Sequence, residues 1–460
     1  MAIRKQITYL NGRVYGCVDL GTSVDKNDQD NFEEATSALV FLAVCLNGHW
    51  KVPLGYFLIH SLSGSERGNL LKKCLELFND TGAKCHSITL DGASCNMTMC
   101  TSLGANFDYY SPNFKPWIKN PGILKCSEID QPIYIFWDAA HMIKLVRNTL
   151  GDKKIIVDQE NKKIKWSHIV DLLEIQNSKG LHSANKLKKT HVRYYENKMN
   201  VRLAAQTLSS SVSSSLKFCE HLNLLKETNP TAIFCEVFND AFDITNCRNK
   251  LAKGNYYLPI NNKTLPHIKQ FLDKFKSYVE NLRYEGSTSQ PEGELLLKSQ
   301  RKTGFLGLII CITNLINLFE VVKRYEMSYI LGYKLSQDHL EVFFSAMRSR
   351  GGYNNNPNSV QFKTAYKRLL VRHEIKSSEY GNCSVLDTCS ILFVGTAMRK
   401  DADAICDVNT DNNENLALFD EVDHDYYKHL PALEEYVVDI VKYTSGFIVF
   451  KTFLTTIGYN

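Results

Sequence analysis

Three carboxylates far apart in the sequence have the types and surroundings expected of a metal-dependent phosphoryl-transfer site. Asp338 and Glu341 are three residues apart in a segment that predicts an amphipathic helix over 336–348, so both lie on one helix face. Asp91 follows a short apolar run, which places its carboxylate at the end of a predicted strand. Oxygen ligands gathered from distant segments are what a divalent cation needs to act on a phosphodiester. The pattern predicts a nuclease-like site, against the simpler alternatives of an Asp-Gly turn and a solvated acidic helix face.

A second polar group opens the helix predicted over 138–148. Asp138 has the type and position of a helix N-cap. His141 and Lys144 share one face of this helix, and Lys144 or Arg147 could contact a phosphate. We interpret the group as structural or DNA-positioning rather than catalytic.

Two further residues complete the candidates. Asp19 ends a predicted strand, where it is either a third metal ligand or the cap of a loop. Arg348 lies on the same face of the predicted helix 336–348 as Glu341, so it is a candidate DNA contact or structural residue.

Composition sets outer limits on the protein. At 460 residues the chain exceeds one ordinary core, and its net charge is only +5. Residues 141–200 hold 13 Lys and Arg against 6 Asp and Glu, whereas 401–425 hold nine acids and neither Lys nor Arg. This distribution fits a nucleic-acid or nucleotide face next to an acidic linker, or equally two solvated faces of opposite sign. The 14 cysteines include no C-x-x-C pair, which favours a reduced intracellular setting.

The order of predicted elements indicates an α/β fold. Hairpins at 7–19 and 37–60 precede a helix at 68–79, a strand at 86–90, a strand at 133–137 and the helix from 138. This order matches a ribonuclease H-like mixed sheet interrupted by a large, mostly α-helical insertion, with a helical C-terminal part. The apolar segment 304–331 predicts a buried helix rather than a membrane span, because it contains Asn314 and Asn317.

We therefore expect five parts. They are a first sheet part at 1–148, a helical insertion at 149–325, a final sheet-domain part with the acidic helix at 326–375, an acidic linker at 376–425 and a C-terminal segment at 426–460.

Six short runs occur in a fixed order along the chain: Tyr15 to Gly21, Leu90 to Ala93, Asp138 to Asn148, Phe238 to Asp243, Gln337 to Ser345 and Tyr443 to Val449. Together they make the chain resemble the P-element transposase family, which includes the vertebrate THAP-domain transposases. The resemblance implies cut-and-paste transposition of DNA at a ribonuclease H-like Asp-Asp-Glu site with two Mg²⁺ (or Mn²⁺) ions. It also implies GTP bound, without hydrolysis, by the helical insertion.

Residue by residue, the resemblance assigns two catalytic metal ligands and a nucleotide site. Asp91 matches the second catalytic aspartate and Glu341 the catalytic glutamate. The residues that match nucleotide contacts are Val201, Ser209, Phe242, Asp243, Asn246 and Asp338. An aspartate can accept both the N1 and N2 donors of guanine, and no P-loop motif of an ordinary GTPase occurs.

The chain also departs from the family pattern. The first catalytic aspartate would fall just before Met1, and the zinc-coordinating THAP domain would lie further upstream. A two-metal site relies on that bridging acid, so we expect the chain as written to be catalytically incomplete.

Three hypotheses stay open. The chain is a transposase whose sequence lacks its ends, a decayed or domesticated DNA- and GTP-binding protein, or a helical nucleotide-binding regulator. The implied partners are transposon-end DNA and further copies of the chain, with no membrane, and the DNA substrate implies the nucleus.

Overall fold

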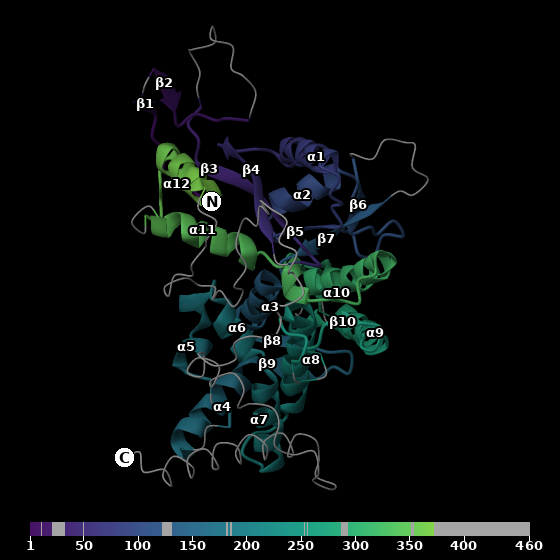
Figure 1. Ribbon diagram of the computed structural model, residues 1–460. Helices are drawn as coiled ribbons and strands as arrows, with labels where there is room; N and C mark the ends of the chain where they lie inside the picture. The colour runs from purple at the N-terminus through teal and green to yellow at the C-terminus, as the bar shows by residue number, and fades with distance from the viewer. Residues whose placement is uncertain are drawn as a thin grey trace, which may run out of the picture. The chain divides into compact units, whose positions relative to one another are not determined.

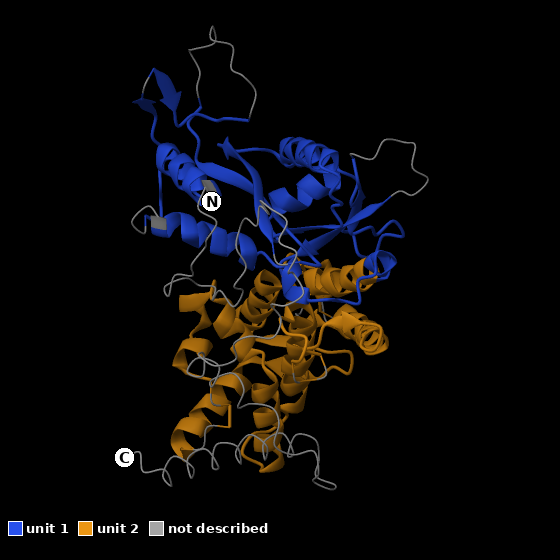
Figure 2. Ribbon diagram, viewed as in Figure 1, with its two compact units in different colours: residues 1–138, 320–396 blue, residues 139–319, 397–460 orange. Residues whose placement is uncertain are grey.

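The computed structural model describes residues 1–10, 12–20, 33–48, 50–121, 131–180, 183–184, 186–252, 254, 256–286, 293–350 and 354–371 (Figure 1). The expected acidic linker and C-terminal segment lie outside these residues. The described chain forms two units (Figure 2): of the described residues, unit 1 contains those in 1–138 and 320–371, and unit 2 contains those in 139–319. The division falls after residue 138, where 148 was expected, because the whole helix that begins at Ala139 belongs to unit 2.

Unit 1 combines small sheets with helices. Its elements are β1 (Thr8–Leu10), β2 (Arg13–Tyr15), β3 (Ser37–Val44), β4 (Lys51–Ile59), α1 (Gly64–Asp80), β5 (Ser87–Leu90), α2 (Ser94–Ser102), β6 (Trp117–Lys119), β7 (Pro132–Trp137), η3 (Lys323–Tyr325), β12 (Tyr329–Ile330), η4 (Gly332–Leu335), α11 (Asp338–Arg350) and α12 (Ser359–Val371).

The strand pairing follows the predicted order of antiparallel strands and then a parallel pair. β1 pairs with β2 and β3 with β4, both antiparallel, so the two predicted hairpins are confirmed. β5 and β7 are parallel, with Leu90 opposite Trp137, and β6 adds an antiparallel edge to β7. The carboxyl ends of β5 and β7 therefore lie at the same edge of this sheet.

Helices α11 and α12 supply one wall of the unit 1 core. Phe343 and Met347 of α11 and Phe362 of α12 are buried in one cluster with Val40 and Leu58 of the β3–β4 hairpin. Burial of these side chains removes apolar area from water and fixes the face that α11 turns to the hairpin. The amphipathic helix predicted over 336–348 is confirmed as α11.

Helix α1 begins earlier than its amphipathic pattern predicted, at Gly64 instead of Gly68. A capping box explains the extension: Ser63 Oγ accepts from the Glu66 amide at 3.3 Å, and the Glu66 carboxylate accepts from the Ser63 amide at 2.8 Å.

Unit 2 is mainly helical. Its elements are α3 (Ala139–Lys153), β8 (Ile155–Val157), β9 (Lys163–Lys165), α4 (Trp166–Lys179), α5 (Lys189–Val192), η1 (Tyr194–Asn197), α6 (Val201–Thr207), α7 (Ser210–His221), α8 (Asn229–Asn246), β10 (Ile260–Asn261), α9 (Leu265–Asn281), β11 (Arg283–Tyr284), η2 (Leu296–Lys298) and α10 (Thr303–Val322). The short strands β11, β8 and β9 form an antiparallel sheet.

Helix α10 is the central apolar element of unit 2. The Phe238 ring of α8 meets Phe275 of α9 and Phe305 of α10 edge-on, with ring centroids 5.6 and 5.4 Å away. The stretch 303–325 is long and apolar enough to cross a membrane, but 78% of its most apolar window is buried inside the fold, as in a core helix. The prediction that the helix continues to residue 331 is wrong, because Glu326 adopts a left-handed conformation (φ 61°) and β12 follows.

The α1–α2 crossing offers a test of how tightly unit 1 is packed behind Asp91. A Cβ at Gly64 would lie 2.9 Å from the Met99 amide nitrogen and against Thr98. We expect Gly64→Ala to lower the free energy of unfolding by about 1–3 kcal/mol in denaturant titrations. Gly55→Ala, where a Cβ has open space, is the control and should not destabilise. Equal stability of the two variants would contradict the close approach of α1 and α2.

Candidate active site and nucleotide site

Asp91 follows the last residue of β5 and shapes the turn into α2. Its Oδ1 accepts hydrogen bonds from the Ala93 amide at 3.1 Å and from Asn96 Nδ2 at 2.6 Å. These bonds fix the carboxylate at the strand end, as the turn interpretation required. Within the described chain Asp91 Oδ2 makes no hydrogen bond, so one oxygen holds the turn and the other is available as a ligand.

Asp138 occupies the equivalent place on the neighbouring strand. It follows the last residue of β7, and its amide continues the ladder by donating to Leu90 O at 2.8 Å. Its side chain is almost fully buried, at 1% exposure, and Oδ1 accepts from the Gln337 amide at 3.0 Å. The N-cap interpretation did not foresee this partner 199 residues away.

The segment before α11 is attached to the same sheet edge. Thr89 Oγ1 of β5 donates to Leu335 O at 2.9 Å, and the Gln337 amide donates to Asp138. Gln337 O in turn accepts from the Glu341 amide at 3.1 Å. The structure therefore brings the ends of β5 and β7 and the first turn of α11, with Asp338 and Glu341, to one edge.

The donor set at this edge fits a hard divalent cation only in part. Asp91 and Glu341 are carboxylates of the kind that Mg²⁺ or Mn²⁺ prefers. Among the described residues, however, no three His, Cys, Asp or Glu side chains form a group that could hold a metal ion. Asp19 does not complete the set: its backbone pairs with Leu58, and its carboxylate lies 3.2 Å from Lys363 Nζ of α12. The first catalytic aspartate of the Asp-Asp-Glu site, which the resemblance implies, stays a prediction.

Arg348, Arg67 and Asp91 all act electrostatically on the amino group of Met1. Burial, with the charges of Arg348 and Arg67, lowers the pKa of the Met1 amino group to about 6, and the charge of Asp91 opposes them. Arg348, Arg67 and Asp91 thus act on one point. Arg348 was among the predicted residues. Arg67 was missed, because the sequence gives it no signal beyond a polar first turn of α1.

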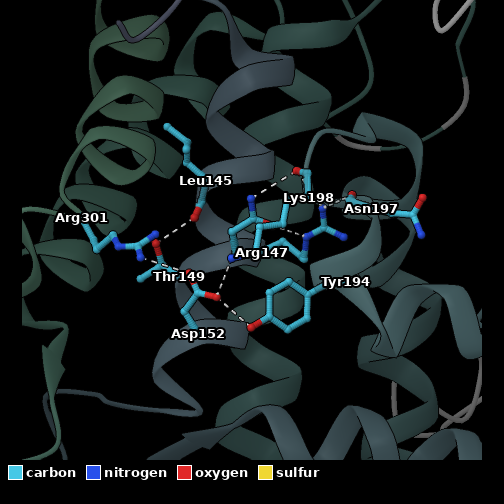
Figure 3. A network of polar contacts seen from close by, with 9 residues as sticks. Leu145, Arg147, Thr149, Asp152, Tyr194, Asn197, Lys198 and Arg301 are labelled. Atoms are coloured by element: carbon cyan, nitrogen blue, oxygen red, sulfur yellow. Dashed lines mark hydrogen bonds and ion pairs between the residues drawn. The ribbon is translucent and has the colours of Figure 1, made fainter. Parts of the chain in front are cut away.

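The predicted phosphate contacts of α3, Lys144 and Arg147, are buried, which favours the structural alternative over DNA contact. Lys144 is 5% and Arg147 0% exposed, and His141 is partly buried. Arg147 donates from one terminal nitrogen to Asn197 O and Lys198 O at 3.2 Å each and from Nε to Asn148 Oδ1 at 2.8 Å (Figure 3). Burial lowers the pKa of Arg147 to about 10. Its guanidinium therefore binds the η1–α6 loop from inside unit 2.

Asp152, one turn further along α3, gathers the neighbouring charges. Its carboxylate accepts from Tyr194 Oη at 2.8 Å and lies 3.3 Å from Lys198 Nζ and 3.1 Å from Arg301 (Figure 3). Burial and the bond to Asp152 raise the pKa of Tyr194 to about 12. Tyr194 also packs its ring on Gly151, where no Cβ would fit.

Three of the predicted nucleotide-contacting residues lie on α8: Phe242, Asp243 and Asn246. Phe242 and Asp243 are partly exposed, and Asn246 ends the helix and accepts from Arg248 at 3.4 Å. Asn239 Nδ2 donates to Asp243 Oδ2 at 2.9 Å and to Asp240 Oδ1 at 3.3 Å. Burial first, and then the charge of Asp240, raise the pKa of Asp243 to about 7. Burial likewise raises the pKa of Asp240 to about 7.

Asn239 joins these acids to the predicted contact at α7. Ser209 is the N-cap of α7, with Oγ accepting from the Val212 amide at 3.4 Å, and the next amide, of Ser210, donates to Asn239 Oδ1 at 3.3 Å. Sequence reasoning missed Asn239 although it lies in a matching run. Val201 is the first residue of α6. Asp338 belongs to unit 1, whereas the other predicted nucleotide contacts belong to unit 2.

Three family models match the chain in order. They are described as the RNase H N-terminal domain (residues 1–104), the GTP-binding insertion domain (140–258) and the RNase H C-terminal domain (333–367) of TNP-like proteins. Together they match more than half of the sequence. Human DNA transposase THAP9 is 28% identical over 391 residues, and the Drosophila melanogaster transposable element P transposase is 28% identical over 329.

The chain belongs to the P-element transposase family. The alignments span 84% and 71% of the chain, but only 41% and 40% of the two relatives. Among solved structures, the Drosophila P element transposase strand transfer complex matches with a TM-score of 0.65 at 24% identity, over 81% of this chain and 75% of that one. This likeness shows the fold. The predicted P-element family and ribonuclease H-like fold with a GTP-binding insertion domain are confirmed.

The burial of Arg147 gives a test that separates structure from DNA contact. We expect Arg147→Met to lower the free energy of unfolding by about 2–4 kcal/mol, because two carbonyls lose a charged donor. DNA affinity of the folded variant, measured at fixed salt, should equal that of the wild type. Arg193→Met is the control: Arg193 is 60% exposed and forms only a 3.9 Å surface pair with Glu196, so stability should stay within about 0.5 kcal/mol. Loss of DNA affinity in folded Arg147→Met would restore the phosphate-contact interpretation.

Proposed function

We propose that this chain carries the DNA cleavage and strand-transfer chemistry of a P-element-like transposase, with GTP as a cofactor that is not hydrolysed. One observation carries the proposal. The hydrogen bonds at Leu335 and Gln337 attach the first turn of α11 to the strand ends that precede Asp91 and Asp138. They bring the two matching acids, Asp91 and Glu341, to one sheet edge although 250 residues separate them in the sequence.

In this proposal Asp91 and Glu341 hold Mg²⁺ or Mn²⁺. The chemistry that such an ion would supply is activation of a water or a 3′ hydroxyl and stabilisation of charge on the phosphate. The bonds from Ala93 and Asn96 keep the Asp91 carboxylate in one orientation. Arg348 and Arg67 act, together with Asp91, on the Met1 amino group, and their positive charge would favour the approach of a phosphodiester backbone.

The proposed cofactor site is formed by α8. Asp243 would accept the N1 and N2 donors of guanine, and Phe242 would stack on the base. Asn239 holds Asp243 Oδ2, and the other oxygen makes no hydrogen bond within the described chain. A carboxylate with one fixed oxygen suits the recognition of a planar donor pair.

The DNA substrate of the proposed reaction indicates the partners of the chain. They are transposon-end DNA, GTP and further copies of the chain, acting in the nucleus because the DNA is there. The second candidate is a domesticated, non-catalytic DNA- and GTP-binding protein.

Nicking of duplex DNA in Mg²⁺ or Mn²⁺ is the test of the active site. It is run on this chain and on a form extended by Asp-Glu before Met1, the dipeptide that the resemblance places there. We expect the extended form to cut, and Asp91→Asn or Glu341→Gln to reduce the rate at least about 100-fold, because each removes a metal ligand.

The control for nicking is Glu66→Gln, which changes a carboxylate of α1 outside the proposed ligand set. It should cut at the wild-type rate. If neither form cuts DNA although both are folded and bind GTP, the non-catalytic candidate replaces the nuclease.

GTP affinity should depend on pH through Asp243. With its pKa near 7, the unliganded carboxyl is protonated in acid and then cannot accept both guanine donors. We expect affinity, measured by titration calorimetry, to fall about tenfold from pH 8 to pH 6. Asp243→Asn should prefer xanthosine triphosphate to GTP, because xanthine carries an acceptor where guanine has the N2 donor.

Asp240→Asn is the matched control, one turn away on the same helix. Removing its charge lowers the pKa of Asp243, so GTP should still be preferred while the pH dependence moves to more acid values. Unchanged GTP preference in Asp243→Asn would rule out this residue as the base-recognising acid.

A further inference from the structure

The approach of the chain to α11 is held at three points, all within unit 1. Lys334, 7% exposed, donates from Nζ to Gly48 O at 3.0 Å in the turn between β3 and β4. Thr89 Oγ1 donates to Leu335 O, and the Gln337 amide donates to Asp138 Oδ1. We call residues 334–337 the anchor segment. It fixes where α11 begins relative to the carboxyl ends of β5 and β7.

Of these three contacts, only the one at Asp138 has a side-chain oxygen that accepts from a backbone amide, that of Gln337 at the start of α11. Gln337 precedes the first residue of α11, and its carbonyl accepts from the amides of Leu340 at 2.9 Å and Glu341 at 3.1 Å. A shift of Gln337 therefore moves the turn that carries Glu341. A carboxylate next to the N-terminus of a helix is also favoured by the helix dipole.

Burial distinguishes Asp138 from the proposed ligand Asp91. The Asp138 side chain is 1% exposed and its Oδ1 accepts from the Gln337 amide, whereas Asp91 is partly exposed. An ordinary core aspartate would stabilise unit 1 as a whole. Asp138 instead bonds the residue that caps the helix bearing one proposed ligand, directly beside the strand that ends at the other, Asp91.

We propose that Asp138 is a positioning residue, which sets the distance between Asp91 and Glu341 by holding Gln337 at the start of α11. The proposal rests on the proposed function, in which these two acids bind the metal. It predicts that losing the acceptor at residue 138 separates the two ligands, while keeping an acceptor there preserves the site.

Hydrogen exchange of amides in α11 tests the holding contact without any metal. Asp138→Ala removes the acceptor, so the first-turn amides of Leu340 and Glu341 should exchange about tenfold faster or more. Asp138→Asn keeps an acceptor oxygen and should stay close to the wild type. Asn79→Ala is the control, since it removes a side-chain pair with Asn120 elsewhere in unit 1 and should leave α11 unchanged. Wild-type protection of α11 in Asp138→Ala would overturn the proposal.

Cleavage of the polypeptide by bound Fe²⁺, with ascorbate and peroxide, tests the consequence for the site. Fe²⁺ held by both acids should cut the wild type, Asp138→Asn and Asn79→Ala near residues 91 and 341. In Asp138→Ala the cut near 91 should remain and the cut near 341 should fall at least tenfold. Equal cutting at both places in Asp138→Ala would overturn the positioning role. A wild type cut at neither place would overturn the metal site itself, while the exchange experiment still decides whether Asp138 holds the helix.

Discussion

The hydrogen bond between the Gln337 amide and the Asp138 carboxylate closes unit 1 across 199 residues of chain. Unit 1 is discontinuous, so its last helices must find strands that were completed before unit 2 began. The entropy cost of closing a loop rises only slowly with the length of the loop. A large insertion is therefore tolerated when specific contacts offset that cost. The anchor segment and the burial of Phe343 and Met347 against the β3–β4 hairpin supply those contacts.

The parts of this structure that the sequence predicted are those with local causes. Two apolar runs joined at Asn47-Gly48 indicated the β3–β4 hairpin, and amphipathic spacing indicated α11. The strand-end position of Asp91 was predictable for the same reason. The start of α1 and the end of α10 were misjudged because a capping box and a left-handed Glu326 outweighed the apolar pattern. Arg67 and the partner of Asp138 depend on contacts between distant segments, which no local pattern contains.

Charge in the sequence carried less information than burial in the fold. The sequence left Arg147 as either a structural residue or a phosphate contact, and in the fold its guanidinium is fully buried and bonded to backbone carbonyls. Asp243 lies in a similar helical context but shares a partly buried face with Asp240, so its ionisation is suppressed near neutral pH. Burial therefore makes Arg147 a structural residue, whereas it leaves the Asp243 carboxyl able to respond to a ligand.

The division of unit 1 into two stretches also sets an order of events on the ribosome. Residues 139–319 are made before the helix that completes unit 1, so at about 5–20 residues per second the early strands wait roughly 10–40 s for it. During that time unit 2 can fold, while the apolar face of the β3–β4 hairpin has no α11 to cover it. Chaperone demand and misfolding should therefore concentrate on unit 1, the part that is started first and finished last.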